Sequence, residues 1–341
     1  MKRKVTLADI ALECGISKMS VSLALRKRHG VSEATRALVE RKAKELGYRP
    51  DPELAALHRY RHNAATPHIQ ASLAWLDISL RPAERPQRKE FELYWQGAKE
   101  NAHQLGYRLE RFNLADTPIQ RIHTILTTRN IRGIILPPLH SEQASGLEAF
   151  DWSDFAVIRL GQTIPSPKTH YVASAQMKNT VMAFQQVRQR GYQRIGYVGS
   201  RNDSRFFSAG YLWAQNAVPQ TQRLPMLEID PPIESRSKRE ALKSWLREHR
   251  PDAIITDKGA LLPQLQNLGY RIPEDIGLAT TSVHDTPIDT GIDQRPYEIG
   301  RTAIRLIASL IAEGSYGIPE YGDEMLVEGR WVDGSMLPPR P

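Results

Sequence analysis

Residues 5–48 read VTLADIALECGISKMSVSLALRKRHGVSEATRALVERKAKELGY and begin with two short helical patterns around a glycine. The Thr6 hydroxyl can accept a backbone N–H at the start of the first helix, and Asp9 completes a near capping box. Gly15 tolerates the left-handed conformation that ends a helix, and Ser17 can cap the helix that follows. The spacing therefore predicts two helices joined by a short turn.

A third and longer helical pattern follows, which Ser32 can cap and Gly47 can end. Two helices joined by a short glycine turn and followed by a third helix form a helix-turn-helix. Apolar residues recur at helical spacing in all three patterns, so each helix has one face that can pack against the others. These residues are Leu7, Ile10, Ala11, Val21, Leu23, Ala24, Leu25, Leu38, Val39, Ala43 and Leu46.

Positive charge is concentrated around this helical head. Residues 1–62 carry 14 Lys and Arg against 7 Asp and Glu, whereas the other 279 residues carry 32 and 31. A small helical bundle with no nucleic-acid role is the alternative interpretation of the three helices. A basic excess confined to the head favours a phosphate-binding surface instead.

Residues 6–52 resemble the DNA-binding head of the LacI (lactose-repressor) family of bacterial regulators. The family pattern is V-T-x-x-D-(I/V)-A-x-x-x-G-(V/I)-S-x-x-(T/S)-V-S, then (V/I)-S-x-x-T-R and L-G-Y-x-P. The matching residues are Val5-Thr6, Asp9-Ile10-Ala11, Gly15-Ile16-Ser17, Ser20-Val21-Ser22, Val31-Ser32, Thr35-Arg36 and Leu46-Gly47-Tyr48-Arg49-Pro50.

In a helix-turn-helix, the residues that open the second helix reach base edges in the major groove. Here those residues are Lys18, Met19 and Ser20, with Lys18 expected to address a guanine and Met19 a thymine methyl group. Leu23 replaces the Arg that is common in the family, so the operator should differ from the usual one. The residues expected to hold phosphates are Thr6, Ser17, Ser22, Arg26, Lys27 and Arg28.

Residues 50–66 follow the third helix and resemble the hinge helix of the family. Paired across a dimer, that helix enters the minor groove and inserts a leucine between base steps. Leu57 matches this leucine, but Asp51, Glu53 and Leu54 depart from the family pattern. An ordinary linker helix with Leu57 packed on the core is therefore kept as an alternative.

From His68 onward, short apolar segments alternate with amphipathic helical patterns in two successive series. This alternation predicts two similar α/β subdomains, each a parallel sheet with helices on both faces. A helix over 297–312 and a strand over 324–328 follow the second series, and the sequence leaves open which subdomain they join. The other expected strands are 71–78, 108–113, 133–136, 155–160, 194–198, 226–229, 253–256 and 276–280.

Residues 68–341 resemble the effector-binding core of the same family, which is similar to periplasmic sugar-binding proteins. The segments that carry this resemblance are 132–136, 190–196, 210–211, 251–254, 269–276 and 299–303. In that fold the chain crosses between subdomains three times, and we expect the crossings near 161–166, 291–295 and 317–322.

The resemblance implies a division into a DNA-binding head, a hinge or linker, and an effector-binding and dimerisation core. The expected ranges are 1–49, 50–66 and 67–341. Within the core, the first subdomain is expected over about 67–162 and 295–318, and the second over about 163–292 and 321–341.

A ligand of two facing α/β sheets would bind beyond the carboxyl ends of their strands. Trp75 could stack on a sugar ring there, although it could equally be a core residue. Arg and Asp side chains would take sugar hydroxyls, although Arg205 could equally be a solvated helix residue. The candidate effector-binding residues are Trp75, Asp77, Arg159, Arg205, Asp257, Ser282 and Gln294.

Three polar ligand contacts of the family are missing or moved. Phe207 stands where an Arg usually precedes the glycine that matches Gly210. Ser282 aligns with a common Asp, and Ala175-Gln176 aligns with a common Asp-Asn. Either the effector differs from a common sugar, or the pocket has changed its use.

Composition excludes several classes of protein. No apolar run approaches the length of a membrane span, and the basic N-terminus lacks the apolar region of a secretory signal. The single Cys14 excludes an internal disulfide and should be a small core residue, so we expect a cytoplasmic protein. Catalytic motifs and metal-ligand spacings are absent from the sequence, so no cofactor, metal or enzymatic activity is predicted.

These observations predict a dimeric, sequence-specific transcription regulator, most simply a repressor. Its partners would be a pseudo-palindromic double-stranded DNA operator, a carbohydrate-like effector bound between the core subdomains, and a second copy of the chain. The alternatives are a solute-binding transport protein with a fused head and a sugar-processing enzyme with a regulatory head.

Overall fold

The structure is a computed structural model that describes residues 5–25, 30–48, 69, 71–77, 89–114, 117–138, 147–162, 166–200, 205–230 and 235–340. The predicted hinge over 50–66, with Leu57, lies outside the described residues. The same holds for three predicted phosphate contacts: Arg26, Lys27 and Arg28.

The head consists of α1 (Leu7–Cys14), α2 (Lys18–Leu25) and α3 (Glu33–Glu45). Fully buried apolar side chains from each helix meet at its centre, namely Ile10, Val21 and Val39. All three belong to the predicted apolar faces, so the head has the packing that the 3- and 4-residue spacing requires.

The ends of the head helices follow the predicted capping chemistry. The Asp9 N–H donates to the Thr6 hydroxyl (3.4 Å), and the Thr6 N–H donates to the Asp9 carboxylate (2.8 Å), which completes a capping box. Gly15 ends α1 in the left-handed region (φ 65°). Ser32 accepts the Thr35 N–H (3.2 Å) and thereby caps α3. The capping predictions are confirmed.

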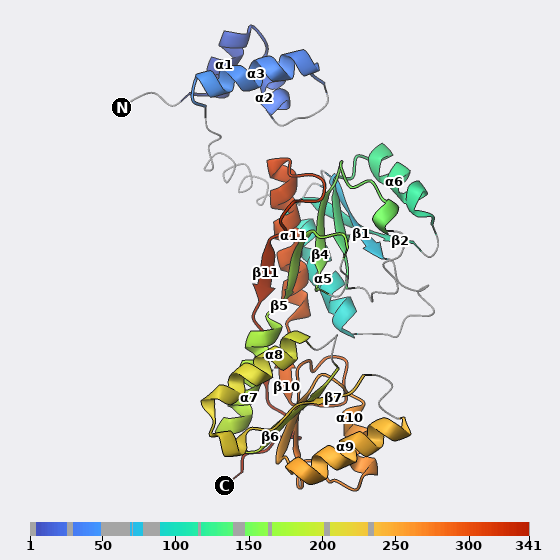
Figure 1. Cartoon of the computed structure of the whole chain (residues 1–341). Coiled ribbons are helices and arrows are strands. Elements are labelled where there is room, and N and C mark those ends of the chain that lie inside the picture. Colours follow the sequence, from blue (N-terminus) through green and yellow to red (C-terminus); the bar gives the residue numbers. More distant parts are fainter. Residues whose placement is uncertain are drawn as a thin grey trace.

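The first α/β subdomain is built on a six-stranded sheet in the order β11-β5-β4-β3-β1-β2, with all neighbours parallel. Figure 1 shows it above the second subdomain. Its strands are β1 (Ala71–Asp77), β2 (Tyr107–Asn113), β3 (Gly133–Leu136), β4 (Ala156–Leu160), β5 (His170–Ser174) and β11 (Glu324–Val327). Its helices are α5 (Lys89–Gln104), α6 (Ile119–Thr128) and α11 (Pro296–Glu313), with a 3-10 turn over Leu147–Ala149.

Helices α5 and α11 cover one face of this sheet and touch each other through glycines. A Cβ on Gly97 would lie 2.0 Å from the Tyr297 carbonyl oxygen, and one on Gly300 would lie 2.1 Å from the Tyr94 carbonyl oxygen. Both glycines are therefore needed for the close approach of two helices that are far apart in sequence. This contact places the helix predicted over 297–312 in the first subdomain.

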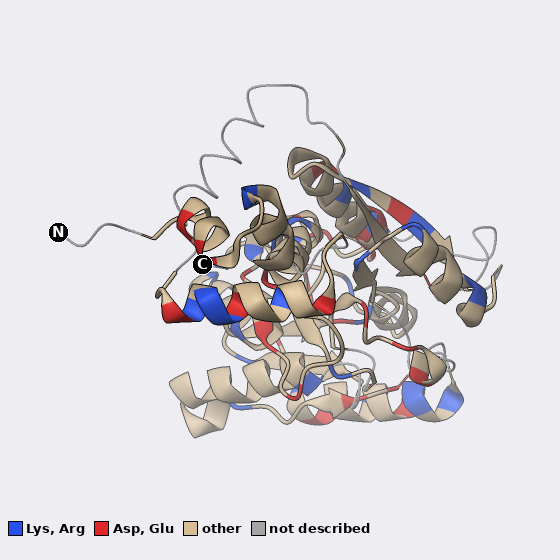
Figure 2. Ribbon diagram, turned by 90° about the horizontal axis from the view of Figure 1, so that it is seen from above, with Lys and Arg blue, Asp and Glu red and all other residues tan. Residues whose placement is uncertain are grey.

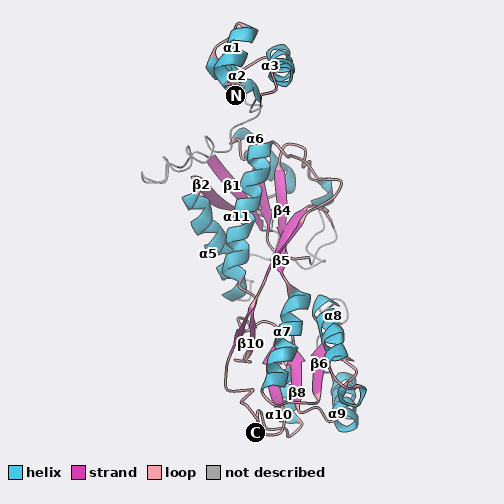
Figure 3. Ribbon diagram, turned by 90° about the vertical axis from the view of Figure 1, so that its left-hand side faces the viewer, coloured by secondary structure: helices cyan, strands magenta, loops and turns pink. Residues whose placement is uncertain are grey.

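The second subdomain has another six-stranded sheet, in the order β12-β10-β9-β8-β6-β7, in which only β12 is antiparallel to its neighbour. Figure 3 shows α7 beside this sheet. Its strands are β6 (Ile195–Gly199), β7 (Leu227–Glu228), β8 (Ala253–Thr256), β9 (Gly277–Thr280), β10 (Gly291–Asp293) and β12 (Arg330–Val332). Its helices are α7 (Gln176–Gln189), α8 (Arg205–Ala214), α9 (Arg236–His249) and α10 (Leu261–Asn267), with 3-10 turns over Gln215–Ala217 and Gln220–Gln222.

The chain passes between the two sheets three times, and two of the predicted crossings are wrong. The crossings follow β5, β10 and β11, which places them at residues 174–176, 293–296 and 327–330. Only the crossing expected near 291–295 agrees. Because β5 and β11 pair with each other in the first sheet, 170–174 and 324–327 belong to the first subdomain, not the second as expected. The stretch over 317–322 leads into β11 and stays in the first subdomain, and residues 161–162 and 166–169 flank β4 and β5 of the same sheet.

Candidate DNA-binding head and effector-binding core

The residues that open α2 project into solvent. Val21 and Ala24 are fully buried and hold α2 against the other head helices. Lys18 and Met19 are exposed on the opposite side, and the Met19 side chain is 74% exposed. A large apolar side chain this exposed on a helix is available for contact with a thymine methyl group.

The predicted hydroxyl contacts already serve the helix ends. The Ser17 hydroxyl accepts the Ser20 N–H (3.0 Å) and lies 2.9 Å from the Ser20 hydroxyl. The Thr6 hydroxyl donates to the Asp9 carboxylate (2.8 Å), while Ser22 is half-buried. Contacts from these residues to DNA would use the lone pairs and protons that remain.

The described part of the head is electrically balanced. Figure 2 shows Lys and Arg interspersed with Asp and Glu over the helices. On α3, Lys42 pairs with Glu45 (2.8 Å) and Arg36 lies 3.9 Å from Glu33. Lys18 has no acidic partner among the described residues, so its ammonium group is available for an acceptor on DNA.

Leu23 has a packing role. It is half-buried, and a Cβ placed on Gly30 would lie 3.6 Å from its Cδ1 atom. Leu23 therefore lies against Gly30 in the segment that leads to α3. An apolar side chain in this place cannot donate a hydrogen bond to a base or a phosphate.

Four of the seven candidate effector residues lie at or just past the carboxyl ends of strands, as predicted. Asp77 ends β1, Asp257 follows β8, Ser282 lies two residues beyond β9, and Gln294 follows β10. The carboxyl ends of β1 and β8 are directed toward the opposite subdomain (Figures 1 and 3). The fold thus gathers polar groups at the junction of the two sheets.

In the second subdomain the Asp257 carboxylate lies beside Gly199, the last residue of β6. A Cβ on Gly199 would lie 2.7 Å from the Asp257 Oδ1 atom, so the glycine admits this carboxylate beside the end of β6. Lys258 forms an ion pair with Asp257 (2.8 Å), and both side chains are largely buried. The Gln294 amide donates to the Thr281 carbonyl (3.0 Å).

Two hydroxyl groups beside these residues lack hydrogen-bond partners within the described part of the chain. They are the buried Thr281 Oγ1 and Ser282 Oγ atoms. A buried hydroxyl without a partner costs free energy, and a ligand hydroxyl could remove that cost by bonding to it. The Thr281 side chain was missed by the sequence analysis, which considered only its neighbour.

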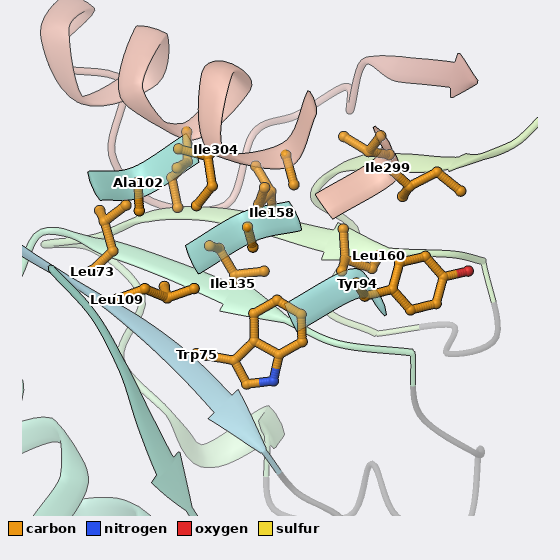
Figure 4. Packing of buried hydrophobic residues seen from close by; sticks show 14 of the residues in the cluster. Leu73, Trp75, Tyr94, Ala102, Leu109, Ile135, Ile158, Leu160, Ile299 and Ile304 are labelled. Carbon is orange, nitrogen blue, oxygen red and sulfur yellow. The ribbon is translucent and has the colours of Figure 1, made fainter. Parts of the chain in front are cut away.

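Trp75 belongs to the hydrophobic core. It is 3% exposed and meets the Trp95 ring edge to face at 5.5 Å. Figure 4 shows it among Tyr94, Leu160 and Ile135 beneath the helices. The assignment of Trp75 to the effector site is corrected accordingly, because strand alternation turns its side chain toward α5.

The two candidate arginines differ in their surroundings. Arg159 lies on β4, is 8% exposed, and places its guanidinium carbon 5.7 Å from the centre of the Tyr171 ring. Burial lowers the pKa of Arg159. Arg205 begins α8, is exposed, and donates to the Gln162 carbonyl (3.1 Å), which links α8 to the segment after β4.

A pocket of about 660 Å³ lies at the junction but contains none of the seven candidates. Its walls include Phe206 and Trp213 of α8 and Leu326 of β11, and the Trp213 side chain is 62% exposed. The other lining residues are Gln162, Ala173, Ser174, Ala175, Gln176, Met177, Lys178, Val181, Glu324 and Glu328. Sequence reasoning missed this pocket because it needs the pairing of β11 with β5 in the first sheet, whereas both segments were expected in the second subdomain.

The described residues contain neither a candidate membrane span nor a candidate metal site. No helix among them is long and apolar enough to cross a membrane. No group of three or more His, Cys, Asp or Glu side chains in the same ranges could hold a metal ion.

Comparison with known proteins finds two families and several similar proteins. Bacterial regulatory proteins of the lacI family match residues 6–51, and the periplasmic binding protein-like domain matches residues 184–331. The HTH-type transcriptional regulator KdgR of Bacillus subtilis (strain 168) is 25% identical over 345 residues, covering 94% of this chain and 96% of the relative.

Two solved structures have the same fold over nearly the whole chain. The transcriptional regulator CelR–cellobiose complex has a TM-score of 0.56 at 19% identity and covers 97% of this chain and 99% of the other. The lac repressor dimer bound to operator and the anti-inducer ONPF has a TM-score of 0.54 at 19% identity, with 98% and 100% covered.

A helix-turn-helix head followed by two parallel-sheet subdomains defines a class of transcriptional regulators with a periplasmic-binding-protein-like core. The head of this chain is similar to the lacI family of bacterial regulatory proteins, and its core is similar to the periplasmic binding protein-like domain.

Proposed function

We propose that this regulator binds a pseudo-palindromic operator as a homodimer and represses transcription until a small molecule changes its affinity for DNA. The observation that carries the proposal is the solvent-facing start of α2, where Lys18 and Met19 are exposed. In this arrangement Lys18 addresses a guanine and Met19 a thymine methyl group. Ser20 supports them through its bond to Ser17.

The homodimer in this proposal follows from the need to read two half-sites, and the lac repressor whose structure is similar was solved as a dimer on its operator. Operators lie on chromosomal DNA, which would place the protein in the cytoplasm. Its basic segments outside the described residues, including Arg26, Lys27 and Arg28, would hold phosphates.

The effector in this proposal is a sugar or sugar derivative bound where the two sheets face each other. The similar CelR structure holds cellobiose. Carboxylates come there from Asp77 and Asp257, and an amide comes from Gln294. The buried hydroxyls of Thr281 and Ser282 lack hydrogen-bond partners among the described residues. Such groups suit a ligand rich in hydroxyls. The effector acts only if its affinity differs between two arrangements of the subdomains.

Two experiments test the proposal with the full chain. Selection from a pool of random duplexes should recover a motif with two related half-sites. A thermal-shift screen of sugars and sugar acids should then find a ligand, because binding at 100 times the dissociation constant adds about 2.7 kcal/mol to stability. Recovery of no common motif contradicts the DNA-binding part, and an unresponsive screen contradicts the effector class.

The competing interpretation is a sugar-binding or sugar-processing protein with a fused head. It predicts that the ligand found in the screen is consumed, or that it binds without changing DNA affinity. Chromatography of the ligand before and after incubation, together with a binding titration on the selected duplex, separates these outcomes. Catalysis has no part in the function proposed here.

A further inference from the structure

The three crossings between the subdomains lie side by side and are joined by buried polar side chains. Asn179, near the start of α7, is fully buried. Its amide nitrogen donates to the Ser174 hydroxyl (2.8 Å), and its amide oxygen accepts the Gly329 N–H (2.9 Å). One side chain therefore connects the first crossing to the third.

A second side chain connects the remaining crossing. The Asp293 carboxylate, 5% exposed, accepts the Arg295 N–H (2.8 Å) in the second crossing. Its other oxygen accepts a hydrogen bond from Arg330 Nε (2.9 Å) at the end of the third crossing. His284, from the segment after β9, lies 2.7 Å from the same carboxylate.

The surroundings of Gly329 leave no room for a side chain. A Cβ on Gly329 would lie within 2.9 Å of the Asn179 amide nitrogen and the Asp293 carbonyl oxygen. An exposed ion pair, Lys178 with Glu328 (2.8 Å), also joins the first and third crossings. Surface pairs of this kind contribute little, whereas breaking a bond to a buried amide leaves an unpaired buried group. Backbone bonds also join the crossings, from the Ala175 N–H to the Val327 carbonyl (2.9 Å) and between β10 and β12. Asn179 and Asp293 are the buried side chains that add to this backbone connection.

We propose that Asn179 and Asp293 are the positioning residues of the regulator, because they fix all three crossings at one point and so define the pivot of any subdomain rotation. The inference rests on the proposed function only because that function makes subdomain rotation the step that changes DNA affinity. Both residues lie in elements of the second subdomain, and Asn179 reaches Ser174 at the end of β5 in the first. Without these links, the two subdomains would sample a wider range of relative orientations.

The test measures the distance between the subdomains in the absence of DNA and ligand. Spin labels are attached to cysteines introduced at the exposed Lys99 of α5 and Lys243 of α9, in a Cys14→Ser background. Labelled chain is diluted with unlabelled chain so that each assembly carries one labelled copy. Pulsed electron–electron double resonance then gives the distribution of distances between the two labels.

We expect Asn179→Ala and Asp293→Asn to widen this distribution by about twofold or more. The matched control is Asn101→Ala, because Asn101 is also a buried asparagine (6% exposed) but lies on α5 away from the crossings. Its distribution should keep the wild-type width. If Asn179→Ala does not fold, Arg330→Gln replaces it, since the Arg330 side chain is 72% exposed and can be changed safely.

A folded Asn179→Ala protein with the wild-type distance distribution overturns the inference, as does an equal widening in Asn101→Ala. If Arg330→Gln is the variant used, an unchanged distribution in it has the same meaning. Since neither DNA nor ligand is present, the result is independent of whether the protein is a ligand-controlled repressor. That question is decided by the duplex selection and the ligand screen.

Discussion

The Ser17 hydroxyl accepts the Ser20 N–H at 3.0 Å and lies 2.9 Å from the Ser20 hydroxyl. The residue that ends the turn of the helix-turn-helix thus fixes the first turn of α2, where the proposed base contacts stand. The backbone N–H and the hydroxyl of Ser20 are both engaged by the Ser17 hydroxyl. Discrimination between bases should therefore depend mainly on Lys18 and Met19.

Ser17→Ala should destabilise the start of α2 by about 0.5–2 kcal/mol, because it removes the acceptor for an otherwise unpaired N–H group. Hydrogen exchange of the full chain should show faster exchange in α2, with α5 and α7 unchanged. Ser32→Ala is the matched control, since Ser32 caps α3. Faster exchange should then appear in α3 instead. Equal protection of α2 in wild type and Ser17→Ala would show that the cap has no energetic role.

Lys18→Ala should weaken binding to the selected duplex by about 1–3 kcal/mol and relax the preference at one base pair of each half-site. Arg28→Ala should weaken binding to all duplexes alike and reduce the salt dependence, because phosphate contacts carry no sequence information. Titrations against the selected duplex and its single-base variants measure both effects. A uniform loss in both variants would contradict the assignment of Lys18 to base recognition.

Ser282→Ala should have opposite effects on stability and on ligand binding. The Ser282 hydroxyl lacks a hydrogen-bond partner among the described residues, so its removal should leave the ligand-free protein equally stable or slightly more stable. The same change should weaken binding of the ligand found in the screen. Calorimetric scans with and without that ligand measure both effects. A loss of stability without ligand would indicate a structural role for the hydroxyl.

Asp293→Asn should lower stability in a pH-dependent way. Burial by itself would raise the pKa of Asp293, but hydrogen bonds from His284, the Arg295 N–H and Arg330 outweigh it and lower the pKa to about 2. A carboxylate with a lowered pKa stabilises the fold above its unfolded pKa of about 3.9, and the contribution disappears as pH falls through about 2. The difference between wild type and variant should therefore be about 2 kcal/mol above pH 4 and should shrink toward pH 2.

Urea unfolding of both proteins at a series of pH values from 6 downward measures this difference. Asp275→Asn is a useful comparison, because a neighbouring Arg271 lowers the pKa of Asp275 to about 2 although this carboxylate is on the surface. Its effect should be small, since salt and water screen it. A difference for Asp293→Asn that does not change with pH would contradict the role given to the ionised carboxylate.

The sequence was sufficient to predict the head and the alternation of the core. Thr6, Gly15, Ser17 and Ser32 act through neighbours three or four residues away, so their roles are visible in a local pattern. The predicted strands over 133–136 and 253–256 have the observed bounds for the same reason. Local spacing predicts local structure.

The subdomain boundaries could not be predicted in this way. The place of β11 depends on its pairing with β5, about 150 residues earlier, and no local pattern records that contact. The role of Asn179 depends on Gly329, which is equally distant. Trp75 illustrates a further limit: its position near a strand end suggested a ligand contact, but strand alternation turns the ring toward α5. Whether that face of the sheet belongs to the core or to a ligand site depends on which helices cover it.

The most direct test of the account is a titration of the selected operator duplex with the full chain, at one salt concentration, with and without the ligand from the thermal-shift screen. Saturating ligand should change the dissociation constant of the duplex by about 5- to 150-fold, which corresponds to a coupling free energy of about 1–3 kcal/mol. The duplex should change the ligand affinity by the same factor. Equal operator affinity with and without saturating ligand would contradict the account.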